Sequence, residues 1–504
     1  MAACRYPFLN AGAAGQSARF ISILLCRQMV HWLCIRAPQL PLEIFSRGGS
    51  EQQPLAVSDG EHRASVLLCN KAAKGSGICP GMPAAAARAL ARDLIIQTRD
   101  HKAEQAALHS LAAWAYQFSS QVSLYPPYAL VLEVLGSQAL FGGRIALLKK
   151  LRTGLAELGY KVQLAGAPTP LAALSLARCQ REQMVEEQGE LTAVLAPLPI
   201  SVLDWEQTLL DRMDGMGVRQ LGDVLRLPRD GLARRLGQQS LQYLDRMLGR
   251  HPDPQDLYQP PPQFKQRLQL LSEVEHTQAL LFALQRLVLE LCGWLRGLGA
   301  GIQTFDIVLS HREGPHTSLR VGMLKQSRDA ETFTTLLRER LERLALQEPV
   351  IAVELRAERI ATLDAQSLDL FEKADGGGGV DLLDRLRARL GDQAVQGISA
   401  VAEHRPEYAW CHSEPGHSRK DTNGRRRPLW LLPVPRQLKT CSGLPRFQGE
   451  LKLQPGRERI ESGWWDEQDV ARDYFVAINP SGARYWIYRE LDGERRWYLH
   501  GIFE

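Results

Sequence analysis

A short apolar run rich in leucine and valine covers residues 129–135, and only Glu133 interrupts it. Gly136 and Ser137 follow directly, and a Leu-Phe-Gly-Gly turn opens at Leu140. A continuous apolar run of this length that ends in turn residues is typical of a strand buried on both faces. The pattern therefore predicts a central strand followed by a tight turn.

Apolar positions with strand-like and helix-like spacing alternate on both sides of this run, from residue 31 to residue 205. The period-2 and short apolar runs predict strands at residues 31–35, 66–69, 94–97 and 162–165. The period-3.6 runs predict helices from residue 40 and at residues 83–94, 104–118, 145–158 and 169–179. This alternation predicts an α/β unit.

Two short predicted helices flank Gly215 and Gly217 within residues 209–236, which is a helix-hairpin-helix pattern. Glycine lets the backbone approach a phosphate closely, and a helix N-terminus behind it favours an anion. These two glycines are therefore candidate DNA-binding residues, with a purely structural helical hairpin as the alternative. The Pro- and Gln-rich residues 253–263 that follow predict a linker.

Residues 264–358 combine two predicted helices, 279–298 and 330–346, with strands at 304–310, 318–324 and 350–355. A second linker at 359–379 ends in four glycines, and a short helix and irregular sequence fill residues 380–426. Residues 427–504 alternate aromatic strands with turns at 479–482 and 492–493, which predicts β-hairpins. Their aromatic side chains form either the core of a small β-rich unit or a protein-binding surface. These side chains are Trp464, Trp465, Tyr474, Phe475, Trp486, Trp497 and Phe503.

Length, net charge and cysteine content are ordinary and leave most classes of globular protein open. A chain of 504 residues predicts three or four domains, and a net charge of +5 permits a polyanionic partner without requiring one. The nine cysteines are scattered and show no metal-binding spacing, as expected for reduced thiols in the cytoplasm. Residues 1–28 are expected to be a disordered extension or sequence upstream of a true start at Met29.

Three stretches carry a resemblance to a known family: WLCIRAPQLPLE, LVLEVLGSQALFGG, and ESGWWDEQDVARDYFVA with WYLHGIF. They resemble the Y-family (UmuC/DinB-like) translesion DNA polymerases, and in particular their catalytically inactive homologues from bacterial mutagenesis cassettes. The resemblance implies a palm at 29–205 with fingers inserted at about 46–95, a thumb at 206–252 and a little finger at 264–358. The β-rich segment at 427–504 would be an addition for protein interaction.

The resemblance also locates the metal-binding carboxylates of the family, and none of them is present. An Asp-x-Asp in the first strand falls on Cys34 and Arg36, and an Asp-Glu pair in the central strand falls on Tyr128 and Ala129. Two-metal phosphoryl transfer needs carboxylates that hold two Mg²⁺ ions through hard oxygen ligands. The sequence therefore predicts no metal, no cofactor and no polymerase activity. An active polymerase with displaced ligands, for instance Glu133 and Asp204, is the alternative.

Other candidate sites follow from position within the implied domains. Lys71 and Lys74 lie nearest to the triphosphate contacts of the fingers, although solvated lysines at a helix start explain them equally well. A basic set in the little finger is predicted to bind DNA, with a solvated basic face as the alternative. This set contains Arg312, Arg320, Lys325 and Arg328.

A peptide in the second linker resembles the motif by which bacterial polymerases bind the β sliding clamp. Its residues are Gln366, Leu368, Asp369, Leu370 and Phe371, with Ser367 where the motif has glutamine. The resemblance implies further partners: primer–template DNA, a RecA-like protein (ImuA) and an error-prone DnaE-type polymerase (ImuC). The implied function is recruitment of that polymerase in translesion synthesis and SOS mutagenesis. A general DNA-repair adaptor unconnected to replication is a third hypothesis.

Overall fold

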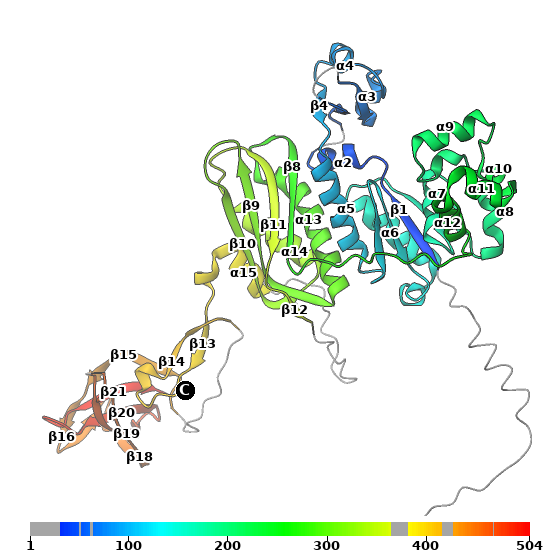
Figure 1. Cartoon of the computed structure of the whole chain (residues 1–504). Coiled ribbons are helices and arrows are strands. Elements are labelled where there is room, and N and C mark those ends of the chain that lie inside the picture. Colours follow the sequence, from blue (N-terminus) through cyan, green and yellow to red (C-terminus); the bar gives the residue numbers. More distant parts are fainter. Residues whose placement is uncertain are drawn as a thin grey trace, which may run out of the picture. The chain divides into compact units, whose positions relative to one another are not determined.

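The structure is a computed structural model, and it describes residues 31–49, 52–60, 64–363, 382–415, 427–466 and 468–503 (Figure 1). Two compact units divide between Arg389 and Leu390. The predicted extension at 1–28 and the predicted clamp-binding peptide lie outside the described residues. The multidomain α/β architecture with a β-rich C-terminal part is confirmed, but the C-terminal unit begins at Leu390 rather than at Arg427.

The palm is a four-stranded antiparallel sheet in the order β5 (Val122–Tyr125), β6 (Ala129–Glu133), β1 (Trp32–Arg36), β7 (Gln163–Ala167). Alternate residues of β1 and β6 face opposite sides. Leu33 and Leu130 pack against α5 (His101–Ala115) and α6 (Arg144–Glu157). Cys34 and Val131 pack on the other side against α7 (Pro170–Arg178). The predicted buried central strand is confirmed, and the short η1 (Gln138–Phe141) follows it.

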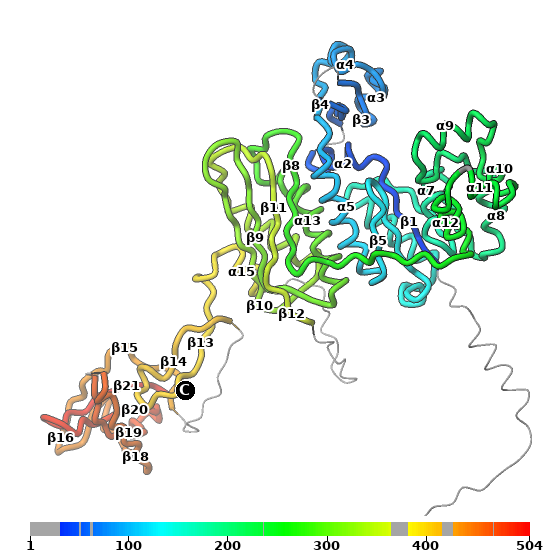
Figure 2. The backbone as a smooth tube through the Cα atoms, in the orientation of Figure 1, coloured from blue at the N-terminus to red at the C-terminus, as the bar shows by residue number. Residues whose placement is uncertain are grey.

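The fingers are an insertion between α2 (Leu40–Ser46) and α5, and the chain returns to the palm through α5 (Figure 2). Their sheet has the order β3 (Val66–Cys69), β2 (Leu55–Ser58), β4 (Ile95–Thr98), with α3 (Lys71–Gly75) and α4 (Ala84–Leu90). A small core of Ala56, Val66, Ile78 and Ala87 holds this layer together. The sequence pattern missed β2 and β5.

The thumb is a group of short helices that covers α7. Leu221, Val224, Leu244 and Met247 pack against the apolar residues of α7, which explains why a segment so rich in arginine folds here. The α-helices are α8 (Leu191–Leu195), α9 (Gln207–Gly215), α10 (Leu221–Arg226), α11 (Arg229–Leu236) and α12 (Gln238–Met247), with η2 (Gln188–Glu190) and η3 (Ile200–Val202).

The little finger is a second sheet, covered on one face by two helices. The strand order is β10 (Thr317–Ser327), β9 (Ala300–His311), β11 (Val350–Ala357), β8 (Phe264–Val274), and β12 (Ala361–Thr362) pairs with β9. The helices are α13 (Thr277–Leu298) and α14 (Ala330–Glu342), and α15 (Leu382–Leu390) follows the second linker. α13 is long and apolar enough to cross a membrane, but 61% of its most apolar window is buried. It forms the core of this domain with Phe305 and Phe333.

The C-terminal unit is a five-stranded antiparallel sheet preceded by a small hairpin. The hairpin pairs β13 (Gly397–Ala400) with β14 (Trp410–Ser413), with η5 (Pro406–Tyr408) between the two strands and η4 (Asp392–Ala394) before them. The sheet has the order β15 (Trp430–Gln437), β21 (Trp497–Ile502), β20 (Arg484–Glu490), β19 (Val470–Ile478), β18 (Lys452–Ser462). β16 (Lys439–Cys441) and β17 (Leu444–Arg446) form a second hairpin. The predicted turns at 479–482 and 492–493 are confirmed.

Candidate nucleic-acid interface and the degenerate metal site

The pairing of β1 with β6 brings most of the predicted metal positions to one end of the palm sheet. Arg36 lies opposite Ala129, and the carbonyl of Tyr128 accepts the N–H of Ala37 at 2.8 Å. Cys34 lies two residues back along β1, opposite Val131. The register therefore brings together the positions that the motif comparison selected, and none of them is a carboxylate.

Burial fixes the chemical state of Cys34. Its side chain is fully buried, and burial raises the pKa of the thiol to about 12. The group therefore stays a neutral thiol near pH 7, and neutral sulfur is a poor ligand for Mg²⁺, which requires hard oxygen donors.

Arg36 is half-buried, and its Nη1 donates to Oε1 of Gln163 on β7 at 2.8 Å. No carboxylate among the described residues forms an ion pair with it. Burial, and after it the charge of Arg178, lowers the pKa of Arg36, but a guanidinium remains charged at neutral pH. A metal cation would meet a positive charge at this position.

Tyr128 is held by a neighbouring ion pair. Nη2 of Arg99 donates to the Tyr128 hydroxyl at 2.5 Å, and the same guanidinium binds both carboxylate oxygens of Glu104 at 2.8 and 2.9 Å. Glu104 is buried, and Arg99 already balances its charge. This carboxylate therefore belongs to a structural pair and is not available to replace the missing ligands.

The two carboxylates of the displaced-ligand alternative lie at opposite ends of the sheet. Glu133 pairs with Trp32, four residues from Arg36, which is about 13 Å along a strand. Asp204 lies next to Arg178, with 3.9 Å between Oδ1 and Nη2. α7 starts just after Ala167, the residue of β7 that pairs with Trp32, and runs antiparallel to β7. Its last residue, Arg178, therefore lies at the end of the sheet where Arg36 pairs with Gln163. A metal-bridging pair of Glu133 and Asp204 is therefore wrong for this structure.

Among the described residues, no group of three or more histidine, cysteine, aspartate or glutamate side chains is placed to hold a metal ion. The residues at the former metal positions do not fit Mg²⁺ in charge or in ligand type. The end of the palm sheet can instead offer hydrogen-bond donors, chiefly the guanidinium groups of Arg36 and Arg178.

The outer face of the little-finger sheet carries a row of charged side chains across all four main strands. The register aligns Arg320 with Asp306, Asp306 with Arg356, and Arg356 with Lys265. Arg267 lies beside this row, opposite Glu354, and is exposed. In the described part of the chain it has no ion-pair partner, whereas Lys265 Nζ lies 3.8 Å from Glu354. The residues named here are four cations and two carboxylates, and the charge of Glu358 also acts on Arg320. The remaining excess of cations favours binding of a polyanion.

The predicted basic set is split by this arrangement. Arg320 binds Asp306 through two hydrogen bonds of 2.7 and 3.1 Å, so that part of its charge is already balanced. Arg312 lies in the turn before β10 and pairs with Glu273 at 3.2 Å. Lys325 lies near the other end of β10, about 26 Å along the strand from Thr317, and Arg328 follows just after β10; both are exposed. The sequence reading missed Lys265, Arg267 and Arg356.

Comparisons with known proteins find relatives for most of the chain. The model of the impB/mucB/samB family matches residues 47–178, which run from the end of α2 to the end of α7. Two proteins named "Protein ImuB" from Caulobacter vibrioides, strains NA1000 / CB15N and ATCC 19089 / CIP 103742 / CB 15, are each 29% identical over 459 residues. The match covers 85% of this chain and 100% of each relative. These matches support an ImuB-like homologue of the Y-family polymerases.

Solved structures that overlap the chain are Y-family polymerases. The "Insertion ternary complex of Dbh DNA polymerase" is 17% identical with a TM-score of 0.37, and covers 66% of this chain and 100% of its own. The "Crystal Structure of DinB from Sulfolobus solfataricus" is 17% identical with a TM-score of 0.34, at the same coverage.

The ImuB-like thumb does not form the predicted phosphate cradle. Gly217 adopts a positive φ of 78° at the turn after α9, as the pattern required. However, the N–H groups of Met216 and Val218 both donate to the carbonyl of Met213, and that of Gly217 donates to Asp214. These amides close the end of α9 and are not free for a phosphate. Contact of Gly215 and Gly217 with DNA stays a prediction without support from the backbone.

The fingers place Lys71 and Lys74 on the exposed side of α3. Asn70 caps this helix by accepting the N–H of Ala73 at 2.9 Å, which satisfies the helix start internally. Neither lysine has an ion-pair partner within the described ranges. The reading as solvated lysines and the reading as triphosphate contacts both remain compatible with this placement.

The C-terminal unit divides its aromatic residues between a core and a surface. Tyr474, Trp486 and Trp497 are buried, as the core reading predicted. Trp464 and Trp465 are 82% and 57% exposed in the turn between β18 and β19. Two neighbouring exposed tryptophans are typical of a binding site for another protein.

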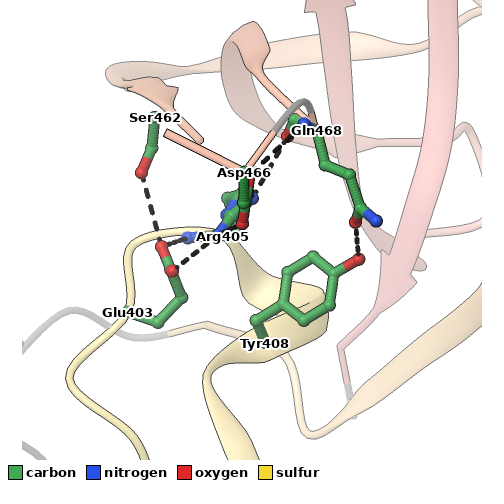
Figure 3. Close-up of polar contacts among 6 residues, drawn as sticks. All are labelled: Glu403, Arg405, Tyr408, Ser462, Asp466 and Gln468. Atoms are coloured by element: carbon green, nitrogen blue, oxygen red, sulfur yellow. Dashed lines mark hydrogen bonds and ion pairs between the residues drawn. The ribbon is translucent and has the colours of Figure 1, made fainter. Parts of the chain in front are cut away.

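Arg405 fixes the shape of this turn (Figure 3). Its guanidinium binds both oxygens of Asp466, at 3.0 and 2.7 Å, and donates to the carbonyl of Gln468 at 3.1 Å. It also binds Glu403 at 2.9 Å. These hydrogen bonds raise the pKa of Arg405, Asp466 contributing most. The small hairpin before the sheet therefore belongs to the same unit as the exposed tryptophans.

Proposed function

We propose that this protein is a non-catalytic DNA-binding factor that recruits an error-prone DnaE-type polymerase (ImuC) to damaged DNA. It would act in translesion synthesis and SOS mutagenesis, in the cytoplasm. The observation that carries the proposal is the paired end of β1 and β6, where Arg36 lies opposite Ala129 and beside Tyr128. The polymerase frame is present there, and the carboxylates of two-metal catalysis are replaced by a cation and neutral groups.

Binding of primer–template DNA is supported by the outer face of the little-finger sheet. Exposed arginine and lysine side chains on a regular sheet provide contacts to phosphates, which do not depend on base sequence. Arg267, Lys325 and Arg328 are exposed, and no ion pair to a carboxylate is found for them among the residues described. They are better candidates for phosphate contacts than Arg312 and Arg320, whose charges are paired.

Recruitment is assigned to two further parts of the chain. The peptide with Gln366, Leu368, Asp369, Leu370 and Phe371 would bind the β sliding clamp, with its apolar residues as anchors. The exposed Trp464 and Trp465 of the C-terminal unit would bind the RecA-like ImuA or the DnaE-type polymerase. The identity to ImuB over 85% of the chain, which includes part of this unit, supports a shared arrangement.

A primer-extension assay with the full-length protein tests the absence of catalysis. No templated nucleotide is expected to be incorporated with Mg²⁺ or with Mn²⁺, while the same preparation retains the labelled primer–template in a binding assay. The binding measurement shows that the protein is folded and engaged. Incorporation that disappears in a Glu133→Ala variant would overturn the proposal in favour of displaced ligands.

A further inference from the structure

The end of the palm sheet has an excess of positive charge at the place where the polymerase frame would need negative charge. Arg36 ends β1 between Ala129 of β6 and Gln163 of β7. Its side chain lies on the α7 face of the sheet, because it is two residues after Cys34, which packs against α7. This placement points the guanidinium toward the helix that covers that face.

Arg178 lies at the same end of the sheet, but it belongs to a helix and not to a strand. It is the last residue of α7, and α7 packs along β7 and β1 in the direction that leads back to Gln163 and Arg36. Its Nη1 donates to the carbonyl of Val202 at 2.7 Å, which fixes the side chain. The nearest carboxylate, Asp204, is 77% exposed and lies at 3.9 Å, the outer limit of an ion pair.

We propose that the degenerate palm binds a phosphate group directly, without a metal ion, through the guanidinium groups of Arg36 and Arg178. Guanidinium groups are the side chains best suited to phosphate because their planar N–H donors match two phosphate oxygens at once. Gln163 holds one donor of Arg36 in place and leaves the others to the ligand. Cys34, a neutral buried thiol, and Ala129 add no negative charge that would repel it.

Two sources of phosphate fit this chemistry: the backbone of primer–template DNA and the triphosphate of a free nucleotide. The first rests on the proposed DNA binding, and the second does not. The mutual repulsion of the two guanidinium groups, which contributes to the lowered pKa of Arg36, is relieved by either anion. The ligand therefore takes the place that the metal ions hold in an active polymerase, and it carries the opposite charge.

The test uses the full-length protein and four variants: Arg36→Gln, Arg178→Gln, Arg36→Lys and Arg496→Gln. Arg496 is a matched exposed arginine of the C-terminal unit, where Glu494 balances it, and serves as the control. Affinity for a labelled primer–template is measured over a range of salt concentrations in EDTA. The shift of the unfolding temperature by a deoxynucleoside triphosphate is measured in the same buffer.

For a DNA phosphate, Arg36→Gln and Arg178→Gln are each expected to weaken binding roughly tenfold, and to reduce the salt slope by about one. Arg36→Lys should recover part of the loss, and Arg496→Gln should behave as the unaltered protein. For a nucleotide, DNA binding stays unchanged and the thermal shift disappears in both glutamine variants. Either pattern supports the proposal and identifies the source.

Unchanged DNA affinity together with an unchanged thermal response in both glutamine variants would overturn the palm site and leave the proposed function intact. A requirement for Mg²⁺ in the unaltered protein would overturn it as well. If the unaltered protein binds neither DNA nor nucleotide, both this inference and the proposed DNA binding fail.

Discussion

Arg47 and Arg36 both belong to the palm, and they differ in what balances the charge. Arg47 is buried at the junction with the little finger, where it forms an ion pair with Glu290 of α13 and a hydrogen bond to the Tyr160 hydroxyl. Its Nε donates to the carbonyl of Leu158 at 2.7 Å. Arg36 has one amide oxygen and no carboxylate among the residues described. The charge of Arg47 is balanced by groups of the protein itself, whereas Arg36 keeps hydrogen-bond donors that a ligand can use.

The pKa values of the two groups follow this difference. Burial alone would lower the pKa of Arg47, but Tyr160 and Glu290 outweigh it and the pKa is raised. For Arg36, burial and the repulsion of Arg178 act together, and the pKa is lowered. A buried charge with a partner stabilises one arrangement of domains, and a buried charge without one is typical of a binding site.

The largest effect is expected from removing the charge of Glu290. Glu290→Gln removes the carboxylate that pairs with buried Arg47 and leaves only the more weakly acting charge of Glu43 near it. Breaking one partner of a buried pair costs about 3–5 kcal/mol. Unfolding by urea, followed by tryptophan fluorescence, measures this loss. Loss of less than about 1 kcal/mol would show that water reaches Arg47 and that the two arginines do not differ as described.

A double variant serves as the control for this prediction. Arg47→Met with Glu290→Leu replaces both charges by apolar groups, which is expected to recover most of the lost stability. Trp114 packs close to Gly293 of α13, where an added Cβ would lie 2.2 Å from the indole, so the apolar contact between palm and little finger stays in place. If the double variant is as unstable as Glu290→Gln, the loss does not come from the unpaired charge.

A second effect is expected in the C-terminal unit, where Arg405 is another fully balanced arginine. Arg405→Gln cannot bridge Glu403 and Asp466, so the turn that carries Trp464 and Trp465 loses its fixed shape. We expect a lower unfolding temperature for this unit and weaker association with the recruited polymerase in a pull-down. DNA affinity should not change.

Arg496→Gln is the matched control for Arg405→Gln, because it removes an exposed arginine of the same unit. If both variants bind the partner equally well, the hydrogen bonds of Arg405 to Glu403 and Asp466 are not needed for recruitment. Deletion of the unit from residue 390, rather than from residue 427, is the matching truncation, since Arg405 and its hairpin lie before residue 427.

Much of the fold, and one part of the site, followed from the sequence. The strand with Glu133 and the turns at 479–482 and 492–493 were local patterns, and the structure confirms them. The motif comparison selected Arg36, Tyr128 and Ala129, and these residues lie side by side in the structure. Local periodicity is enough to predict a strand or a turn whose conformation depends mainly on residues close in sequence.

The remaining features depend on contacts between distant residues or on backbone hydrogen bonds. Arg47 and Glu290 are 243 residues apart. The charge of Arg178 acts on Arg36 because α7 folds back over the sheet. The glycine pattern after α9 predicts close approach of the backbone to a phosphate, but the amides there close their own helix end. Arg267 was missed, although the alternation of Phe264, Leu268 and Leu270 with polar residues was a strand pattern that would have found it.

The same contrast between paired and unpaired charge applies to the little finger, with a smaller effect. Arg267→Ala removes an unbalanced cation and is expected to reduce the salt slope of DNA binding by about one. Arg320→Ala removes a cation that Asp306 already neutralises in part, so a smaller change of slope is expected. Equal slopes for both variants would mean that pairing with Asp306 does not matter on DNA.

The smallest effect is expected for the stability of Arg36→Gln without a ligand. The variant removes a half-buried charge that no carboxylate balances among the described residues, together with its hydrogen bond to Gln163. Loss of its repulsion with Arg178 offsets the lost hydrogen bond, so the free energy of unfolding should change by less than about 0.5 kcal/mol. Urea unfolding of the free protein measures this directly. A loss of several kcal/mol would place Arg36 in the same class as Arg47, as a residue that the fold itself requires.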